Sequence, residues 1–264
     1  MPTLPSEPHR ARQVAESFGT DPDRYDRTRP RYPDTLVQAI IAAGPGRDVL
    51  DVGCGTGIVA RQLQAAGCRV LGVDADARMA EFARRHGVDV EVARFEDWPA
   101  AGRVFDVVVA GQTWHWVDPV AGAAKAAEVL RPGGRLAVFW NVAQTPPSVA
   151  EAFAAVYRRV MPDRPAGLWS TPALDVYSSM FTRASTGIRD TAGFDEPHQW
   201  RFDWEQTYTR DEWLDQVSTH GGNNQLPASV RDDLLTGLGA AIDDVGGTLV
   251  MPYATVAVTA RRTA

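Results

Sequence analysis

The sequence predicts an α/β fold in which a doubly wound, mostly parallel sheet carries helices on both faces. Strand-like apolar runs and helical stretches alternate from residue 48 to residue 140. Residues 105–110 (Phe-Asp-Val-Val-Val-Ala) are almost continuously apolar, as a strand buried on both faces requires. Glycines directly after the first strand mark a tight turn into a helix, which is how a strand–helix–strand unit begins.

Each element has a local signal in the sequence. The expected strands are short apolar or alternating runs, and they fall at 48–52, 69–74, 89–93, 105–110, 135–140, 199–206 and 248–260. The expected helices have apolar residues three or four positions apart, and they fall at 34 onward, 58–66, 76–85, 121–130, 149–160, 172–183, 209–217 and 227–245. Thr209 and Glu212 form a capping box, and prolines break residues 11–32 into one or two short helices.

The alternation stops after Asn141, and this divides the chain. Residues 33–144 are expected to form the core, to which residues 199–264 return with the last strands. Residues 145–198 are rich in proline, serine and alanine, and we expect them to form a helical cap over the carboxyl edge of the sheet. Residues 1–32 are expected to form a lid, the first ten of them a disordered tail.

Composition excludes several classes of protein. The 264 residues are 44% hydrophobic and 23% charged, and the net charge of −6 argues against nucleic acid as the main partner. The two cysteines, Cys54 and Cys68, fit a reducing compartment. No apolar leader is visible, and no apolar run approaches the roughly 18 residues that a membrane span needs. We therefore expect a cytoplasmic monomer or homodimer with no membrane partner.

Residues 49–57 (Val-Leu-Asp-Val-Gly-Cys-Gly-Thr-Gly) and the later Asp74 indicate the ligand. Asp51 would repel a diphosphate at the glycine turn, but it would attract an ammonium group. Asp74 follows the second strand and suits the two hydroxyls of a ribose. S-adenosylmethionine (SAM) carries an amino acid and a ribose but no phosphate. The pair therefore predicts SAM as cofactor and S-adenosylhomocysteine (SAH) as product.

At these residues the chain resembles the class I SAM-dependent methyltransferases, whose first motif residues 49–57 match closely. Residues 110–118 (Ala-Gly-Gln-Thr-Trp-His-Trp-Val-Asp) and 130–134 (Leu-Arg-Pro-Gly-Gly) are also similar to motifs of that family. The segment from Phe18 to Pro33 resembles a subgroup that methylates small molecules, trans-aconitate methyltransferase among them. The resemblance covers residues 11–142 well and the last part of the chain loosely. It implies a seven-stranded Rossmann-like sheet and methyl transfer to a small molecule, most simply to an oxygen of a carboxylate or hydroxyl.

Cofactor-binding residues are expected at the strand ends and in the lid. They are Tyr25, Arg29, Asp51, Gly53, Gly55, Asp74, Ala75, Met79, Phe95, Glu96 and Gln112. Either Glu96 or Asp97 suits the adenine amino group as an acceptor, and Glu96 is preferred. Arg29 could bind the carboxylate of SAM or that of an acidic substrate, so its partner stays open.

Acceptor-side residues are expected after the fourth and fifth strands. His115 is the candidate general base, because an unperturbed pKa of about 6.5 lets it take a proton near neutral pH. In the alternative, His115 only hydrogen-bonds substrate or lid. Trp114, Trp116, Trp140 and Asn141 are expected to contact the substrate. The chain has no Cys/His metal-ligand spacing, and we expect no metal.

Two other functions compete with methyl transfer. A dinucleotide-dependent oxidoreductase uses a similar strand–turn–helix cradle. A non-catalytic SAM-binding protein would share the cofactor site but lack turnover.

Overall fold

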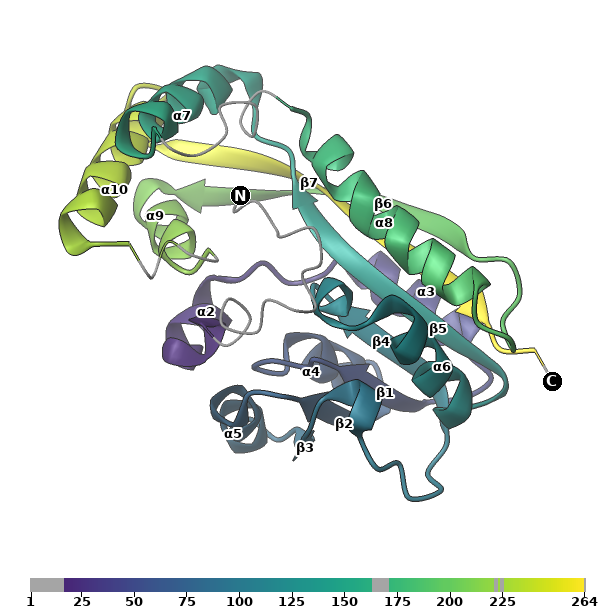
Figure 1. Cartoon of the computed structure of the whole chain (residues 1–264). Helices are drawn as coiled ribbons and strands as arrows, with labels where there is room; N and C mark the ends of the chain where they lie inside the picture. Colours follow the sequence, from purple (N-terminus) through teal and green to yellow (C-terminus); the bar gives the residue numbers. More distant parts are fainter. Residues whose placement is uncertain (1–16, 163–170, 221–222, 224–225, 264) are drawn as a thin grey trace.

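The structure is a computed structural model that describes residues 17–162, 171–220, 223 and 226–263, so the predicted tail at 1–10 lies outside it. Within these residues seven strands form one sheet, in the order β3-β2-β1-β4-β5-β7-β6 (Figure 1). The strands are β1 (Asp48–Val52), β2 (Arg69–Asp74), β3 (Asp89–Val92), β4 (Phe105–Gly111), β5 (Leu130–Ala143), β6 (His198–Thr209) and β7 (Thr248–Arg261). The neighbouring strands β3, β2, β1, β4 and β5 are parallel to one another, and β7 pairs antiparallel with β5 and β6. The predicted doubly wound, mostly parallel, seven-stranded sheet is confirmed.

Helices cover both faces of the sheet. They are η2 (Ser17–Thr20), α2 (Pro22–Thr28), α3 (Asp34–Ala43), α4 (Ile58–Ala65), α5 (Ala77–Arg85), η3 (Phe95–Asp97), η4 (Trp114–Trp116), α6 (Pro119–Val129), α7 (Pro147–Val160), α8 (Ala173–Arg189), α9 (Arg210–Ser218) and α10 (Ala228–Asp243). Side chains of α3, α4 and α5 pack on one face, and those of α6 and α8 on the other. Strand residues alternate accordingly, so that Val49 meets the first layer while Leu50 and Val52 meet the second.

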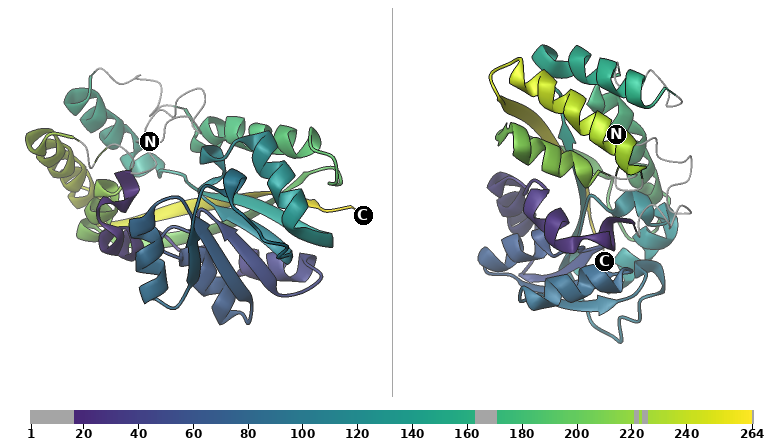
Figure 2. Two further views of the ribbon diagram at one scale, coloured as in Figure 1. Left: turned by 60° about the horizontal axis from the view of Figure 1, so that its bottom comes forward. Right: turned by 90° about the vertical axis from the view of Figure 1, so that its left-hand side faces the viewer.

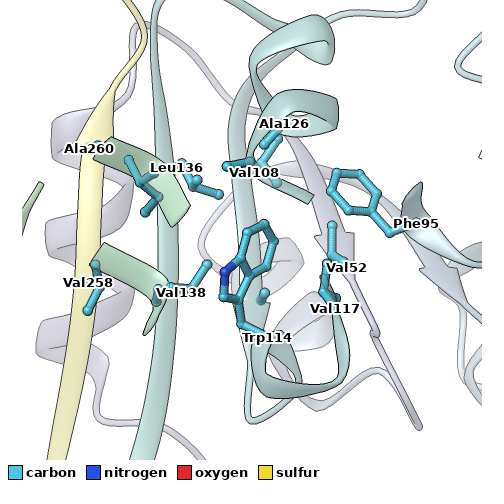
Figure 3. Close-up of a cluster of buried hydrophobic side chains, with 14 of the residues drawn as sticks. Val52, Phe95, Val108, Trp114, Val117, Ala126, Leu136, Val138, Val258 and Ala260 are labelled. Atoms are coloured by element: carbon cyan, nitrogen blue, oxygen red, sulfur yellow. The ribbon is translucent and has the colours of Figure 1, made fainter. Parts of the chain in front are cut away.

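The second layer contains a large buried aromatic ring at the end of β4. Trp114 lies among Val52, Val108, Val117 and Val138 (Figure 3). Residues of three strands, β1, β4 and β5, thus fix the loop after β4 against the sheet, and this loop carries several of the predicted site residues.

The predicted helical cap is not one unit. Within residues 145–198, α8 packs on the sheet through Tyr177, Phe181 and Ile188, so it belongs to the second helical layer. In contrast, α7 packs against α9, α10 and the far ends of β6 and β7 in a separate apolar cluster (Figure 1). The helices of this segment therefore pack on two different apolar clusters, and the sequence pattern does not show which apolar surface each helix meets.

The long antiparallel strands explain this division. β5 runs to Ala143, and β7 pairs with it as far as Tyr253, while β6 and β7 stay paired to Thr209 and Thr248. The sheet therefore extends past the parallel strands and supplies a second apolar surface for α7, α9 and α10. None of the helices described is both long and apolar enough to cross a membrane.

The contact between α8 and α6 depends on Gly187. A Cβ atom there would lie 2.5 Å from the backbone oxygen of Pro119. We expect Gly187→Ala to destabilise the protein by about 1–3 kcal/mol through overpacking, although alanine favours a helix by about 1 kcal/mol. Gly239→Ala in α10 is the control, because its Cβ would meet only the guanidinium of Arg210, the movable end of a long side chain that is 39% exposed. Denaturant titration of both variants checks this, and an unchanged stability of Gly187→Ala would contradict it.

Candidate active site

The turn after β1 is built from three glycines. Gly53, Gly55 and Gly57 have φ angles of 61°, 55° and 85°, in the left-handed region that favours glycine. A Cβ atom on Gly53 would lie 2.2 Å from the Thr113 hydroxyl, whereas one on Gly55 would meet no atom within 4 Å. The turn therefore packs tightly against the loop after β4 and leaves open space in front of Gly55.

Asp74, the last residue of β2, holds this turn. Its Oδ2 accepts a hydrogen bond of 2.7 Å from the Gly55 amide, and its Oδ1 accepts one of 2.8 Å from the Asp76 amide. Burial raises the pKa of Asp74 to about 6, although the two amides lower it in part. A carboxylate offers about four acceptor positions, so Asp74 can also accept from the hydroxyls of a ligand.

Asp51 lies buried in β1, two residues before the turn. Asp51 is only 1% exposed, and neither of its carboxylate oxygens has a hydrogen-bond partner among the described residues. Burial, and secondly the charge of Asp74, raise the pKa of Asp51 to about 8, which the nearby Ala60 amide offsets only in part. A cation would satisfy this carboxylate. The pair of acids therefore fits the ammonium and ribose groups of SAM.

A cavity of about 710 Å³ opens beside these acids. Its walls come from the carboxyl ends of the strands and from α2, α8 and α9. All the residues assigned to the site from sequence line it: Tyr25, Arg29, Asp51, Gly53, Gly55, Asp74, Ala75, Met79, Phe95, Glu96, Gln112, Trp114, His115, Trp116, Trp140 and Asn141. Ligand pockets span about 300–1,000 Å³, so this cavity has room for a cofactor and a small second molecule.

Glu96 faces the cavity and Asp97 does not. The Glu96 side chain is 12% exposed, lines the cavity and accepts a hydrogen bond of 3.1 Å from the Asp118 amide. The Asp97 side chain is 77% exposed and lies outside the lining. Met79 and Phe95 are buried near Glu96 in the same lining. The geometry thus favours Glu96 of the two acids that the sequence left open.

His115 is neutral in this environment. The indole N–H of Trp140 donates a hydrogen bond of 3.1 Å to His115 Nδ1. An indole nitrogen only donates, so Nδ1 is unprotonated and the ring proton sits on Nε2. Burial lowers the pKa of His115 to about 3. This neutral ring favours the alternative role of His115, in which it donates a hydrogen bond to substrate or lid, over the role of general base.

The predicted tryptophans differ in their surroundings. Trp114 and Trp140 are buried in the second helical layer, where Trp140 packs against Phe181 at 5.5 Å between ring centroids. Trp116 is only partly buried, and its ring lies 4.7 Å from that of His115. Trp116 therefore presents more surface to a ligand than the other two.

Two amide side chains join the strand ends to the lid. Gln112 has a φ of 56°, rare for a residue with a side chain, and its Nε2 donates to the Asn141 carbonyl at 3.0 Å. Asn141 Nδ2 donates to the Arg31 carbonyl at 3.1 Å, and its Oδ1 accepts from the Thr255 hydroxyl at 2.6 Å. The Asn141 amide, predicted to face a substrate, thus ties the lid, β5 and β7 together.

The helix α2, which belongs to the segment predicted as a lid, lies between the core and the α9 layer (Figure 2). It buries none of its own residues. Asp26 accepts from Arg61 in the core at 2.5 Å, and Asp215 of α9 accepts from Arg24 at 2.5 Å and from Arg27 at 2.7 Å. Ion pairs therefore fasten this helix on both sides.

Several cavity residues were not assigned from sequence. Among them are Trp213, Gln216, His220 and Tyr253, which come from α9, the residues after it, and β7. Trp213 and Gln216 are three positions apart on one face of α9, and His220 follows just after the helix. That spacing was a usable signal, but only the structure shows that this face turns toward the cavity.

Comparison with known proteins identifies the family. Residues 50–138 match the model of a methyltransferase domain. A malonyl-(acyl-carrier protein) O-methyltransferase of Enterobacter lignolyticus is 30% identical over 201 residues, which are 70% of this chain and 80% of the relative. The chain belongs to the class I SAM-dependent methyltransferases.

Other members of this methyltransferase family give the same result. An uncharacterized methyltransferase of Mycobacterium tuberculosis is 38% identical over 133 residues, which are 49% of this chain and 54% of the relative, so the chain spans about half of that relative's length. Among solved structures, a proposed type II methyltransferase of Anaeromyxobacter dehalogenans has a TM-score of 0.64 at 25% identity, over 88% of this chain and 97% of that chain.

The raised pKa of Asp51 predicts a pH dependence of folding in the ligand-free protein. Its folded pKa of about 8 lies above the ordinary 3.8, so its contribution to stability is full below pH 3.8 and is lost as pH rises through 8. We expect Asp51→Asn to remove this loss. At pH 9 the variant should melt at least about 2–4 °C above the wild type, the shift that 1 kcal/mol gives at this chain length. Scanning calorimetry from pH 4 to about 9 checks this, and parallel Tm curves for the two proteins would contradict it.

The lowered pKa of His115 predicts the nitrogen-15 NMR shifts of its imidazole ring. Between about pH 5 and pH 8 the imidazole should remain neutral, with its proton on Nε2. Nitrogen-15 chemical shifts report both properties, and the His115→Gln variant assigns the signals. A His115 titration centred at about 6.5, the ordinary value, would exclude the buried neutral ring.

Proposed function

We propose that the chain transfers the methyl group of SAM to an oxygen atom of a small-molecule acceptor. The observation that carries this proposal is the unpaired, buried carboxylate of Asp51 beside Asp74, at the ends of two adjacent parallel strands. A diphosphate would be repelled there, whereas an amino acid joined to a ribose satisfies both acids. Membership of the family supports the same cofactor.

On the donor side of the cavity, each predicted cofactor-binding residue except Arg29 has a proposed role. Asp51 neutralises the ammonium group of SAM, Asp74 accepts from its ribose hydroxyls, and Gly53 and Gly55 let the backbone lie against it. The adenine is enclosed by Ala75, Met79 and Phe95, with Glu96 accepting from its amino group; Gln112 and Tyr25 close the site from β4 and the lid. When bound, SAM supplies a methyl group activated by its sulfonium.

On the acceptor side, His115 orients the acceptor. Its Nε2–H can donate to the acceptor oxygen, while Trp140 fixes the tautomer through Nδ1. Trp114, Trp116 and Trp140 line this part of the cavity and exclude water, which helps an in-line displacement. An acceptor carboxylate is already ionised at neutral pH, so it needs no general base.

Oxygen is the proposed acceptor atom for two reasons. The neutral His115 is a poor base for deprotonating an amine or a carbon, but it is a good hydrogen-bond donor to an oxygen. The Enterobacter relative is named as an O-methyltransferase.

The net charge of −6 favours a small molecule over nucleic acid. Family membership disfavours the oxidoreductase alternative, and turnover of any acceptor separates methyl transfer from binding alone.

Calorimetry with SAH and with NAD tests the donor site. SAH should bind and NAD should not, and binding of NAD alone would overturn the proposal. We expect Asp74→Ala to weaken SAH binding by about 1–3 kcal/mol, from the loss of hydrogen bonds to a charged group. Asp97→Ala is the matched control, because it removes the same charge from an exposed acid outside the cavity. Equal losses in the two variants would remove Asp74 from the site.

A further inference from the structure

The sheet ends at β6, and the outer side of this strand is open to another chain. β6 is the last strand in the order of the sheet, with β7 on its inner side (Figure 1). Among the residues that the structure describes, no strand pairs with the outer side of β6. Every second residue of such a strand points its backbone N–H and C=O groups outward. β6 therefore offers a template on which a further strand can pair.

The backbone of β6 lacks the features that usually protect an edge strand. It runs for twelve residues from His198 to Thr209, and its pairing with β7 continues without a bulge. It contains neither proline nor lysine. Proteins commonly use short strands, bulges, proline and lysine to prevent pairing at an edge. A regular edge of this length is therefore suited to binding another strand.

The two faces of β6 differ in chemistry. Trp200, Phe202 and Trp204 alternate along one face, and each of them is only partly buried. On the opposite face Arg201 Nε donates to Asp203 Oδ1 at 2.9 Å, and these side chains are 52% and 62% exposed. A strand that pairs with β6 must therefore match aromatic rings on one face and a pair of opposite charges on the other.

A second copy of β6 matches both faces in one register. In an antiparallel pair, directly opposed residues lie on the same face of the sheet, so a two-fold axis passes through a residue position. With the axis at Phe202, Arg201 lies opposite Asp203 of the second copy, and Asp203 lies opposite the other Arg201. Trp200 then lies opposite Trp204, and the two Phe202 rings meet. Opposite charges and aromatic pairs are cross-strand pairs that stabilise an antiparallel sheet.

Charge disfavours the neighbouring registers. An axis at Arg201 opposes the two arginines. An axis at Asp203 pairs Arg201 with Glu205, but it sets the two Asp203 carboxylates against each other, and an axis one position later opposes Asp203 to Glu205. Like charges directly opposite destabilise a sheet. The axis at Phe202 avoids these contacts and pairs every residue of the stretch 198–206.

We propose that two copies of the chain associate through β6, antiparallel about a two-fold axis at Phe202, and so form one continuous sheet. The occupant of the edge is a second copy because its charges complement those of β6 in this register. The two Arg201–Asp203 pairs then make a cluster of four charges that alternate in sign across the contact. None of the twelve residues of β6, all of them described, lines the cavity, so this association does not close the site.

Reciprocal charge changes, followed by sedimentation velocity, test the register. The wild type should be a dimer. Arg201→Asp opposes acids in both cross-strand pairs, and Asp203→Arg opposes arginines, so each variant alone should have a dissociation constant at least about tenfold higher. A mixture of the two variants restores opposite charges in both pairs and should form a heterodimer. The double variant Arg201→Asp/Asp203→Arg should form a homodimer again.

The matched control is Arg158→Asp, which breaks an exposed ion pair with Glu151 on α7, away from β6. It should leave the dimer intact. A wild type that stays monomeric would overturn the inference, and so would a dimer that the β6 variants leave unchanged. Failure of the two single variants to associate when mixed would overturn the register at Phe202.

A disulfide provides an independent measure of the register. Directly opposed residues of antiparallel strands have Cα atoms about 4.5–5.5 Å apart, within the range that a disulfide spans. Phe202→Cys should therefore yield a cross-linked dimer on oxidation, whereas Thr207→Cys, whose two copies lie far apart along the paired strands, should not. The native Cys54 and Cys68 are buried and should not react. Cross-linking through Cys at 207 but not at 202 would contradict the proposed pairing.

Discussion

The hydrogen bond from the Gly55 amide to the Asp74 carboxylate is the interaction on which the site depends. It joins the turn after β1 to the tip of β2, two strands that are paired in parallel up to Val52 and Val73. The join fixes the backbone in front of which a ligand lies, and it holds Asp74 near Asp51. The charge of Asp74 raises the pKa of Asp51, and a bound cation would offset this effect.

The second constraint is the antiparallel strand β7. Because β7 lies between β5 and β6, the sheet continues beyond its parallel part and carries α7, α9 and α10. Asn141 joins this extension to the lid, through Thr255 of β7 on one side and the Arg31 backbone on the other. The cavity is thus enclosed by two layers of structure built on one sheet, one layer beside the glycine turn and the other beside α9.

Sequence reasoning was most successful where the pattern is local. Residues 49–57 and Asp74 give the turn and its acid, and apolar runs give the strands, because both depend on neighbouring residues. It failed where an environment is made by distant residues. The pKa of His115 depends on burial under Trp140, and the direction of Trp213 depends on where β6 and β7 place α9. The hydrogen bond between Asn141 and Thr255 could not be predicted either, because Thr255 lies more than a hundred residues away in the chain. The division of residues 145–198 between two apolar clusters also depends on distant residues, so the sequence pattern did not predict it.

The attachment of α2 by ion pairs bears on how fast ligands enter and leave the cavity. This helix contributes no buried side chain, and its attachments to the core and to α9 are partly exposed ion pairs. Such pairs contribute about 0–1 kcal/mol each, and they weaken as dissolved ions screen them over a distance of about 8–10 Å. The attachment of α2, which forms part of the cavity wall, therefore weakens as the salt concentration rises. Ionic strength should set how fast molecules enter and leave while the sheet beneath stays intact.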